Sequence, residues 1–178
     1  MTNRLFLTRR PDLATARLLL RRPHQGDADA IVGIVGKWDV ARRLARVPHP
    51  YDLAHARFFL EQVVPAEWVW AVTLQGNGTL VGAIGLTPEQ GGTAELGYWL
   101  SPACWGQGIT TEAARAVVEF GFESLKLPVL TSGYFEDNPA SGQVLRKLGF
   151  VETGRVMRSC LAMGRDVPSI RMALRRPA

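Results

Sequence analysis

Two glycines near the middle of the chain stand where a strand-like segment gives way to a helix, and their spacing suggests anion binding. The run Trp105-Gly106-Gln107-Gly108-Ile109-Thr110-Thr111 follows the strand-like residues 94–100. Gly106 and Gly108 can adopt backbone angles that are closed to residues with a Cβ, and they leave the amide hydrogens at the helix start open to an anion. The positive end of the helix dipole adds to that attraction. The turn therefore predicts a phosphate site, although a plain helix start with two turn glycines fits the same residues.

The turn matches neither of the common nucleotide-binding loops. A Walker loop has Lys and then Ser or Thr directly after its last glycine, where this chain has Ile109 and Thr110. A Rossmann fingerprint has a third glycine at the position that Thr111 occupies. Neither loop is predicted here.

The turn instead resembles the acyl-CoA-binding turn of the GNAT superfamily of N-acetyltransferases, whose general form is Arg/Gln-x-x-Gly-x-Gly/Ala. Trp105 and Thr110 depart from that form at its two ends. The run Gly97-Tyr98-Trp99-Leu100-Ser101-Pro102-Ala103-Cys104-Trp105-Gly106-Gln107-Gly108, followed by Thr111-Glu112-Ala113, is similar to the branch that acetylates the N-termini of ribosomal proteins, including the ribosomal-protein-alanine N-acetyltransferases. Asn138-Pro139-Ala140-Ser141 and Lys147-Leu148-Gly149-Phe150 resemble a second signature of the family.

The resemblance implies direct transfer of an acetyl group from acetyl-CoA to a primary amine, either a protein N-terminus or a small amine. A catalytically silent CoA-binding regulatory module is the alternative from another class, and the presence of Glu95 and Ser141 favours an enzyme. The resemblance also implies that the cosubstrate is contacted by Trp99, Leu100, Trp105, Gly106, Gln107, Gly108, Ile109, Thr110, Thr111, Asn138 and Ser141.

Such a transfer requires a neutral amine and a proton for the leaving thiolate. A lysine amine with a pKa of about 10.4 loses its proton at a cost of roughly 4–5 kcal/mol at pH 7, whereas an α-amine near 8 costs only about 1 kcal/mol. One carboxylate or a water relay is therefore sufficient to remove the proton from an α-amine. Strand alternation puts Glu95 and Trp99 on one side of residues 94–100 and Tyr98 on the other. Glu95 is the predicted base, with a solvent-facing strand carboxylate as the alternative.

Asn138 and Ser141 are the polar residues at the start of the next predicted helix. Asn138 precedes Pro139 and is suited to cap that helix. The resemblance implies that Asn138 contacts the pantetheine arm and that a residue in the following turn protonates the thiolate. Ser141 lies three residues on and is the predicted acid. Because a serine hydroxyl is a weak acid, a hydrogen bond to the sulfur or to a water is the alternative.

Hydrophobic periodicity predicts an α+β fold. The resemblance implies a mixed, mostly antiparallel central sheet with helices on both faces and a splay between the fourth and fifth strands, residues 94–100 and 129–135. The predicted strands are 17–22, 68–74, 80–86, 94–100, 129–135, 150–157 and 169–174, and the predicted helices are 27–36, 39–46, 52–65, 106–124 and 139–148.

Length and composition predict one domain over 1–178, with residues 1–16 as a peripheral N-terminal arm. No leader-like or membrane-spanning run appears, so we expect a cytoplasmic protein without a membrane partner. Neither the two cysteines nor the three histidines follow a metal-ligand spacing, so we expect no metal. The sequence is compatible with either a monomer or a homodimer.

The formal charge of +5 is spread over several predicted elements, which favours anionic ligands in general over nucleic acid. Arg42, Arg43 and Arg46 lie at near-helical spacing. They are predicted to form a solvated face, and the alternative is that they bind an acidic acceptor or the 3′-phosphate of CoA.

Overall fold

A single eight-stranded sheet runs through the part of the chain that the computed structural model describes, residues 10–176. Its strands follow the spatial order β1-β2-β3-β4-β5-β6-β8-β7, and every neighbouring pair is antiparallel except β5 and β6. The strands are β1 (Leu13–Ala14), β2 (Leu18–Arg21), β3 (Trp68–Leu74), β4 (Leu80–Pro88), β5 (Ala94–Leu100), β6 (Val129–Phe135), β7 (Val151–Cys160) and β8 (Arg165–Arg175).

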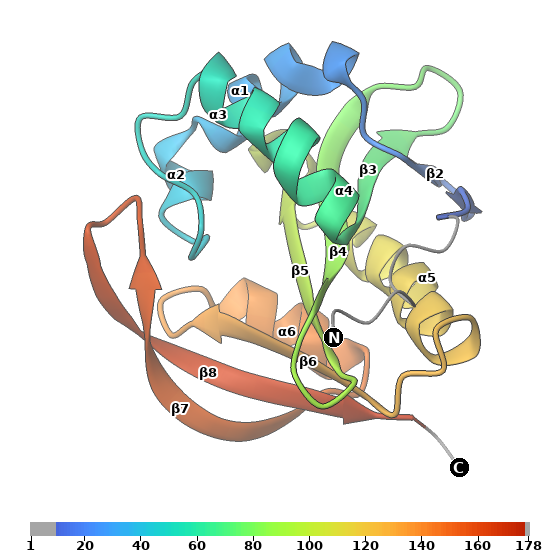
Figure 1. The fold of residues 1–178 in the computed structure, drawn as a ribbon, viewed down its shortest axis with the longest axis vertical. Coiled ribbons are helices and arrows are strands. Elements are labelled where there is room, and N and C mark those ends of the chain that lie inside the picture. Colours follow the sequence, from blue (N-terminus) through green and yellow to red (C-terminus); the bar gives the residue numbers. More distant parts are fainter. Residues whose placement is uncertain (1–9, 177–178) are drawn as a thin grey trace.

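Helices cover both faces of this sheet (Figure 1). One face carries α1 (Ala28–Val35), α2 (Trp38–Ala41), α3 (Leu53–Phe58) and α4 (Val64–Ala66), with a π-helical turn at Phe59–Val63. The other face carries α5 (Ile109–Glu123) and α6 (Pro139–Lys147). Short 3₁₀ turns lie at Gln25–Asp27 and Pro102–Cys104. None of the helices in residues 10–176 is long and apolar enough to cross a membrane.

The two parallel strands separate soon after they meet. β5 and β6 share only two register pairs, Ala94 with Leu130 and Glu95 with Thr131. At the next position the buried Ser132 hydroxyl donates a hydrogen bond of 2.8 Å to the Leu96 carbonyl oxygen, so a side chain replaces the backbone ladder. We call the divergence of residues 96–100 from residues 132–135 the splay. The predicted fold class and splay are confirmed, with the fourth and fifth predicted strands now labelled β5 and β6.

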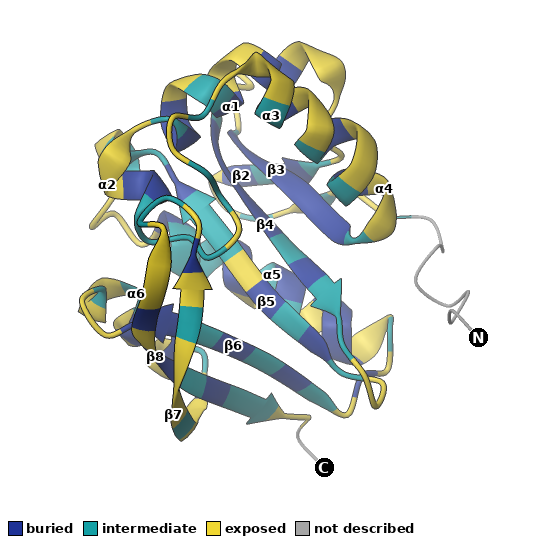
Figure 2. Ribbon diagram, turned by 60° about the vertical axis from the view of Figure 1, so that its left-hand side comes forward, coloured by how far each residue is buried: buried dark blue, intermediate teal, exposed yellow. Residues whose placement is uncertain are grey.

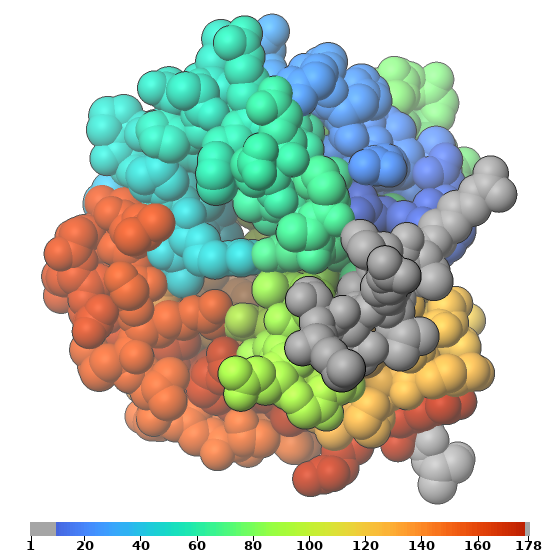
Figure 3. Space-filling view, in the orientation of Figure 1, coloured from blue at the N-terminus to red at the C-terminus, as the bar shows by residue number. Residues whose placement is uncertain are grey.

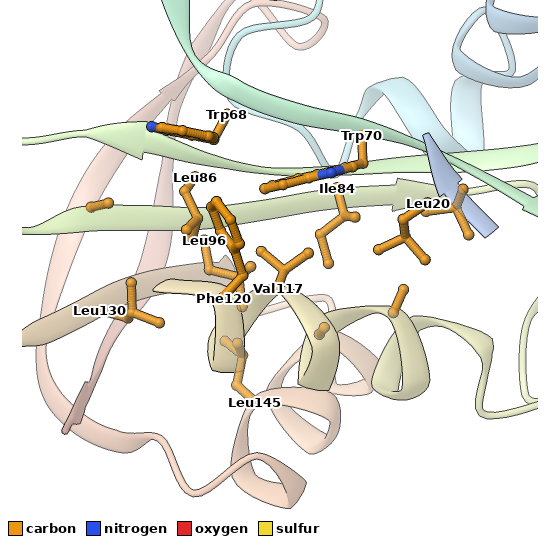
Figure 4. Close-up of a cluster of buried hydrophobic side chains, with 14 of the residues drawn as sticks. Leu20, Trp68, Trp70, Ile84, Leu86, Leu96, Val117, Phe120, Leu130 and Leu145 are labelled. Atoms are coloured by element: carbon orange, nitrogen blue, oxygen red, sulfur yellow. The ribbon is translucent and has the colours of Figure 1, made fainter. Parts of the chain in front are cut away.

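The larger core lies between the sheet and the α5–α6 layer. Phe120 of α5 packs its ring against Trp68 and Trp70 of β3, with centroid distances of 5.1 and 5.2 Å (Figure 4). Figure 4 also shows Leu96 and Val117 beside these rings. A smaller core under α1 and α3 takes the alternate residues of the strands, such as Val69 and Ala83. β7 forms one edge and is exposed along most of its length (Figure 2).

The predicted N-terminal arm is held down over residues 10–16. The Arg10 guanidinium donates to the carbonyl oxygens of Val64, Glu67 and Val69, and the Trp70 indole donates to the Pro11 carbonyl oxygen at 2.8 Å. These contacts and β1 tie the segment to β3 and β2. The rest of the predicted arm, residues 1–9, lies outside the described residues.

Asp27 occupies the N-cap position of α1, but its side chain does not cap that helix. The buried carboxylate instead accepts two hydrogen bonds from Arg21, at 2.9 and 2.7 Å, and one from the backbone N–H of His24. Burial raises the pKa of Asp27, but the bonds from Arg21 and His24 outweigh it and hold the pKa below its usual range. The helix start at residue 27 agrees with the predicted range 27–36, although the Asp27 side chain is bound by Arg21 and His24 and not by the helix N-terminus.

Candidate active site

One cavity of about 850 Å³ occupies the splay and is lined from both faces of the sheet. Tyr51 and Phe59 line it from the α1–α4 side, and Ser141 and Val144 line it from α6. A volume of this size lies at the upper end of the range for small-molecule sites. The splay therefore leaves room for a ligand that reaches from one face of the sheet to the other.

The glycine turn has the backbone that the sequence predicted. Gly106 and Gly108 have φ angles of 74° and 75°, and Gly108 is the N-cap of α5 in the left-handed region. Both line the cavity together with Ile109, Thr110 and Thr111. Gln107 is not part of the cavity wall, because its side chain turns back and donates to the Ala103 carbonyl oxygen at 2.9 Å.

A clamp from the connection between β1 and β2 fixes this turn, and sequence reasoning missed it. Glu112 in the first turn of α5 accepts hydrogen bonds from the Thr15 hydroxyl, the Arg17 backbone N–H and Arg17 Nε. Arg17 Nη1 also donates to the Gln107 carbonyl oxygen at 3.0 Å. Burial raises the pKa of Glu112, but the bonds from Thr15 and Arg17 outweigh it and lower the pKa below its usual value. The clamp joins residues 95 positions apart, so local spacing gives no signal of it.

Trp105 folds back along the end of β5. Its indole N–H donates to the Leu100 carbonyl oxygen at 3.0 Å, and both residues line the cavity. Trp99 lines the cavity on the opposite face and packs with the smaller core of Val69 and Ala83. Trp99, Leu100 and Trp105 are thus all on the cavity wall, and the Leu100 carbonyl oxygen already has a donor.

Asn138 and Ser141 lie at the mouth of α6 and line the same cavity. Asn138 occupies the N-cap position, but its side chain makes no capping hydrogen bond and remains available to a ligand. The Ser141 hydroxyl lies 2.8 Å from the Tyr98 hydroxyl of β5. Burial raises the pKa of Tyr98 to about 12, although the hydrogen bond with Ser141 acts in the opposite direction. Tyr98 was not among the predicted site residues; strand alternation put it on the side opposite Glu95, and in the structure that side faces α6.

Glu95 lines the cavity from the other face of the sheet, as its alternation with Tyr98 predicted. It is not a free carboxylate. Arg158 of β7 donates to both of its oxygens, once from Nη1 and once from Nη2 at 3.0 Å, and Arg171 of β8 lies 3.4 Å from Oε1. Glu95 can therefore take a proton only if an arginine shifts or a water bridges to the acceptor.

A second carboxylate, Glu67, lies near Glu95 on the same face and also lines the cavity. It accepts hydrogen bonds from Arg46 Nη1 and from the Thr87 hydroxyl, each at 2.7 Å. Thr87 is the register partner of Glu95 across β4 and β5, which brings the two carboxylates into one polar row. Sequence reasoning missed Glu67 because it precedes β3, far from any recognised motif. Among the described residues, no group of three or more His, Cys, Asp or Glu side chains is arranged to hold a metal ion.

Comparison with known proteins identifies the family. A family model described as "Acetyltransferase (GNAT) domain" matches residues 17–151. The structure of an acetyltransferase of the GNAT family from Bacillus anthracis superposes with a TM-score of 0.83 at 23% identity, covering 93% of this chain and 98% of that one. The uncharacterized N-acetyltransferase YoaA of Bacillus subtilis is 29% identical over 151 residues, 81% of this chain and 85% of the relative.

Two shorter matches show the acceptors found among relatives. The ribosomal-protein-serine acetyltransferase of Escherichia coli is 39% identical over 62 residues, 35% of each chain. The spermidine N(1)-acetyltransferase of Escherichia coli is 32% identical over 81 residues, 46% of this chain and 44% of the relative. The match of the family model over most of the chain, together with the fold, confirms the family that the glycine turn suggested. The chain belongs to the GNAT acetyltransferases and is an acetyl-CoA-dependent N-acyltransferase.

Proposed function

We propose that this enzyme acetylates the α-amine of a protein or peptide N-terminus. The observation that carries the proposal is the single cavity through the splay, which has one wall suited to the cosubstrate and an opposite wall with carboxylates for the amine. The match to a ribosomal-protein-serine acetyltransferase supports this acceptor class. A ribosomal-protein acceptor would also put the reaction in the cytoplasm. We keep a homodimer as part of the proposal because the edge strand β7 exposes Val156 and Met157.

A small amine is the second candidate, supported by the match to a spermidine acetyltransferase. The charges on the cavity wall favour a small polyamine less than they favour a peptide N-terminus. Glu67 and Glu95 are the carboxylates on the wall, and each is already paired with an arginine. A polyamine cation would have to displace those arginines to gain an ion pair, whereas a peptide N-terminus brings only one charge to neutralise.

The cosubstrate would lie along the α5–α6 side of the cavity. The turn at Gly106 and Gly108 offers backbone N–H groups and the positive end of α5 to the pyrophosphate. Asn138 has an uncommitted side chain at the mouth of α6, suited to an amide of the pantetheine arm. Acetyl-CoA supplies an acetyl thioester, and the reaction forms a C–N bond, breaks a C–S bond and moves one proton from the amine and one to the thiolate.

Glu95 is the proposed proton acceptor on the amine side, acting through a water because Arg158 covers its oxygens. An α-amine with a pKa near 8 needs only about 1 kcal/mol to become neutral at pH 7, so an indirect base is sufficient. Glu67 is the competing candidate, since it shares the polar row.

Ser141 is the proposed proton donor to the thiolate, and Tyr98 is its positioning residue. With its pKa raised to about 12, Tyr98 stays protonated at neutral pH, and its hydroxyl lies 2.8 Å from Ser141 Oγ and 3.3 Å from the Ser141 carbonyl oxygen, to which it can also donate. When Tyr98 donates to Ser141 Oγ, the Ser141 proton is left to point toward the cavity. A serine held in this way is a better hydrogen-bond donor to the sulfur than an isolated one.

The first prediction concerns the acceptor. With acetyl-CoA, free-thiol release should be at least about tenfold faster at pH 7 for peptides with a free α-amine than for the same peptides blocked at the N-terminus and carrying an internal lysine, because of the difference in amine pKa. Spermidine should be the poorer substrate. Faster turnover of spermidine would favour the second candidate, and a CoA-induced thermal shift without turnover on any amine would indicate a silent binder.

The second prediction concerns the glycine turn. Gly108→Val should remove most of the thermal stabilisation by CoA, which is about 2.7 kcal/mol at a hundred times the dissociation constant. A Cβ there would meet only Arg17 Nη2, at 3.6 Å, so the loss would come from backbone strain and from obstruction of the turn. Gly91→Val is the matched control, because Gly91 also has a positive φ of 80° but lies in the β4–β5 hairpin. Equal CoA shifts in the two variants would remove the turn from the site.

The third prediction concerns Glu95. Glu95→Gln should lower kcat by about 10²–10⁴ and flatten the acidic limb of the pH–rate profile, with little change in CoA affinity. Glu89→Gln is the control for a purely structural effect, since Glu89 also pairs with Arg171 and is not on the cavity wall. If Glu95→Gln keeps the full rate and profile while Glu67→Gln loses them, Glu67 is the base.

The fourth prediction concerns the Tyr98–Ser141 pair. Ser141→Ala should lower kcat by roughly 10–100-fold, and Tyr98→Phe by a smaller factor, while acetyl-CoA affinity stays within about threefold. The double variant should be no slower than Ser141→Ala alone, because Tyr98 acts only through Ser141. Additive losses in steady-state kinetics would mean that Tyr98 acts on the substrates directly.

A further inference from the structure

The segment that follows α2 crosses the open end of the splay. We call residues 42–46 the arginine segment. Leu161 donates its backbone N–H to the Ala45 carbonyl oxygen at 3.1 Å, and the buried Cys160 thiol donates toward the carbonyl oxygens of Arg42 and Leu44. Figure 3 shows this part of the chain, in cyan, packed against the orange end of β7 and β8. The segment is therefore fixed to the hairpin on the far side of the cavity.

Two of the three arginines in the segment have carboxylate partners. Arg42 Nη1 donates to Asp137 at 2.9 Å, just before α6. Arg46 Nη1 donates to Glu67 at 2.7 Å. These two side chains account for the anchoring of the segment at its two ends, and they leave Arg43 between them.

Arg43 lines the cavity and, unlike Arg42 and Arg46, has no carboxylate partner among the described residues. Its guanidinium lies over the Trp105 ring, 4.7 Å from the centroid, and its Nε is buried with no hydrogen-bond partner. Stacking on an aromatic ring uses the face of the guanidinium, whereas all five N–H donors point outward in its plane. Because Nε is buried, the donors that a ligand in the cavity can reach are those on Nη1 and Nη2, and an anionic group there would pair with them.

The charges on the whole cavity wall also favour an anionic ligand. Its wall carries four cationic side chains and two carboxylates: Arg43, Arg46, Lys147 and Arg158, and Glu67 and Glu95. Both carboxylates are already paired with arginines. The cavity therefore has positive charge left over for a ligand.

The position of Arg43 favours the acceptor over the phosphates of CoA as the source of the anion. The Trp105 indole folds back onto the Leu100 carbonyl oxygen, so the ring under Arg43 lies along the end of β5, not over the start of α5. The glycine turn also offers its own N–H groups to phosphate. Building on the proposed function, we propose that Arg43 binds a carboxylate of the acceptor, so that the enzyme prefers N-termini followed closely by Asp or Glu.

The test compares pairs of peptides that differ only by Asp or Glu against Asn or Gln at the residues next to the α-amine. The native enzyme should favour the acidic member by roughly 10–100-fold in kcat/KM, as expected for hydrogen bonds between charged groups. Arg43→Met keeps the apolar stem over Trp105 and should bring the ratio close to one. Arg57→Met, at an exposed position of α3, should leave it unchanged.

A binding measurement separates this proposal from the proposed function. Titration of the acidic peptide into the CoA-loaded protein should show the same preference, and Arg43→Met should abolish it, even if no amine in the panel is turned over. Affinities for CoA and 3′-dephospho-CoA should stay within about threefold in Arg43→Met and in Arg43→Gln, whose thermal melts report folding. An unchanged peptide ratio, or a loss of affinity for CoA that dephospho-CoA does not share, would overturn the acceptor assignment, and the latter would assign Arg43 to the phosphate.

Discussion

The early end of the β5–β6 ladder is the constraint on which the site depends. A parallel pair normally continues its backbone hydrogen bonds along the strands, but here the Ser132 hydroxyl satisfies the Leu96 carbonyl oxygen. Beyond that point β5 pairs only with β4, and β6 only with β8. The edges that face each other across the splay can therefore line a cavity, and the donors and acceptors left there are available to a ligand.

Cross-links at both ends hold the splay at a fixed width. At its closed end, Glu95 of β5 pairs with Arg158 and Arg171, which come from the strands on the far side of β6. At its open end, Arg42 pairs with Asp137, and Cys160 holds the backbone of the arginine segment. Removing one partner of a partly buried ion pair leaves an uncompensated charge, so these links are costly to break singly. Glu95 consequently has a structural function beside its proposed chemical one.

The parts of this protein that the sequence predicted depend on local patterns. A continuous apolar run located β3, alternation assigned the two sides of β5, and the two glycines located the start of α5 with its left-handed cap. The parts it missed are side-chain pairs between distant positions. The partners of Glu95 come from strands 63 and 76 residues later, and no local spacing encodes them. Asp27 shows a similar limit at short range, because an Asp at a helix N-cap is suited to cap the helix, whereas here Arg21 on β2 binds its carboxylate.

The positive charge of the cavity lowers the demand on the ion-paired carboxylates for proton removal. A cation close to an amine disfavours the protonated amine, and each unit by which its pKa falls is worth about 1.4 kcal/mol. Arg43, Lys147, Arg46 and Arg158 line the same cavity as Glu95 and Glu67, and the two carboxylates neutralise only Arg46 and Arg158. An amine that enters this field is easier to deprotonate than in water, so the carboxylates need only accept or relay its proton. The same positive charge would also bind an Asp or Glu side chain next to the α-amine. Recognition of the acceptor and deprotonation of its amine would then depend on the same cationic side chains.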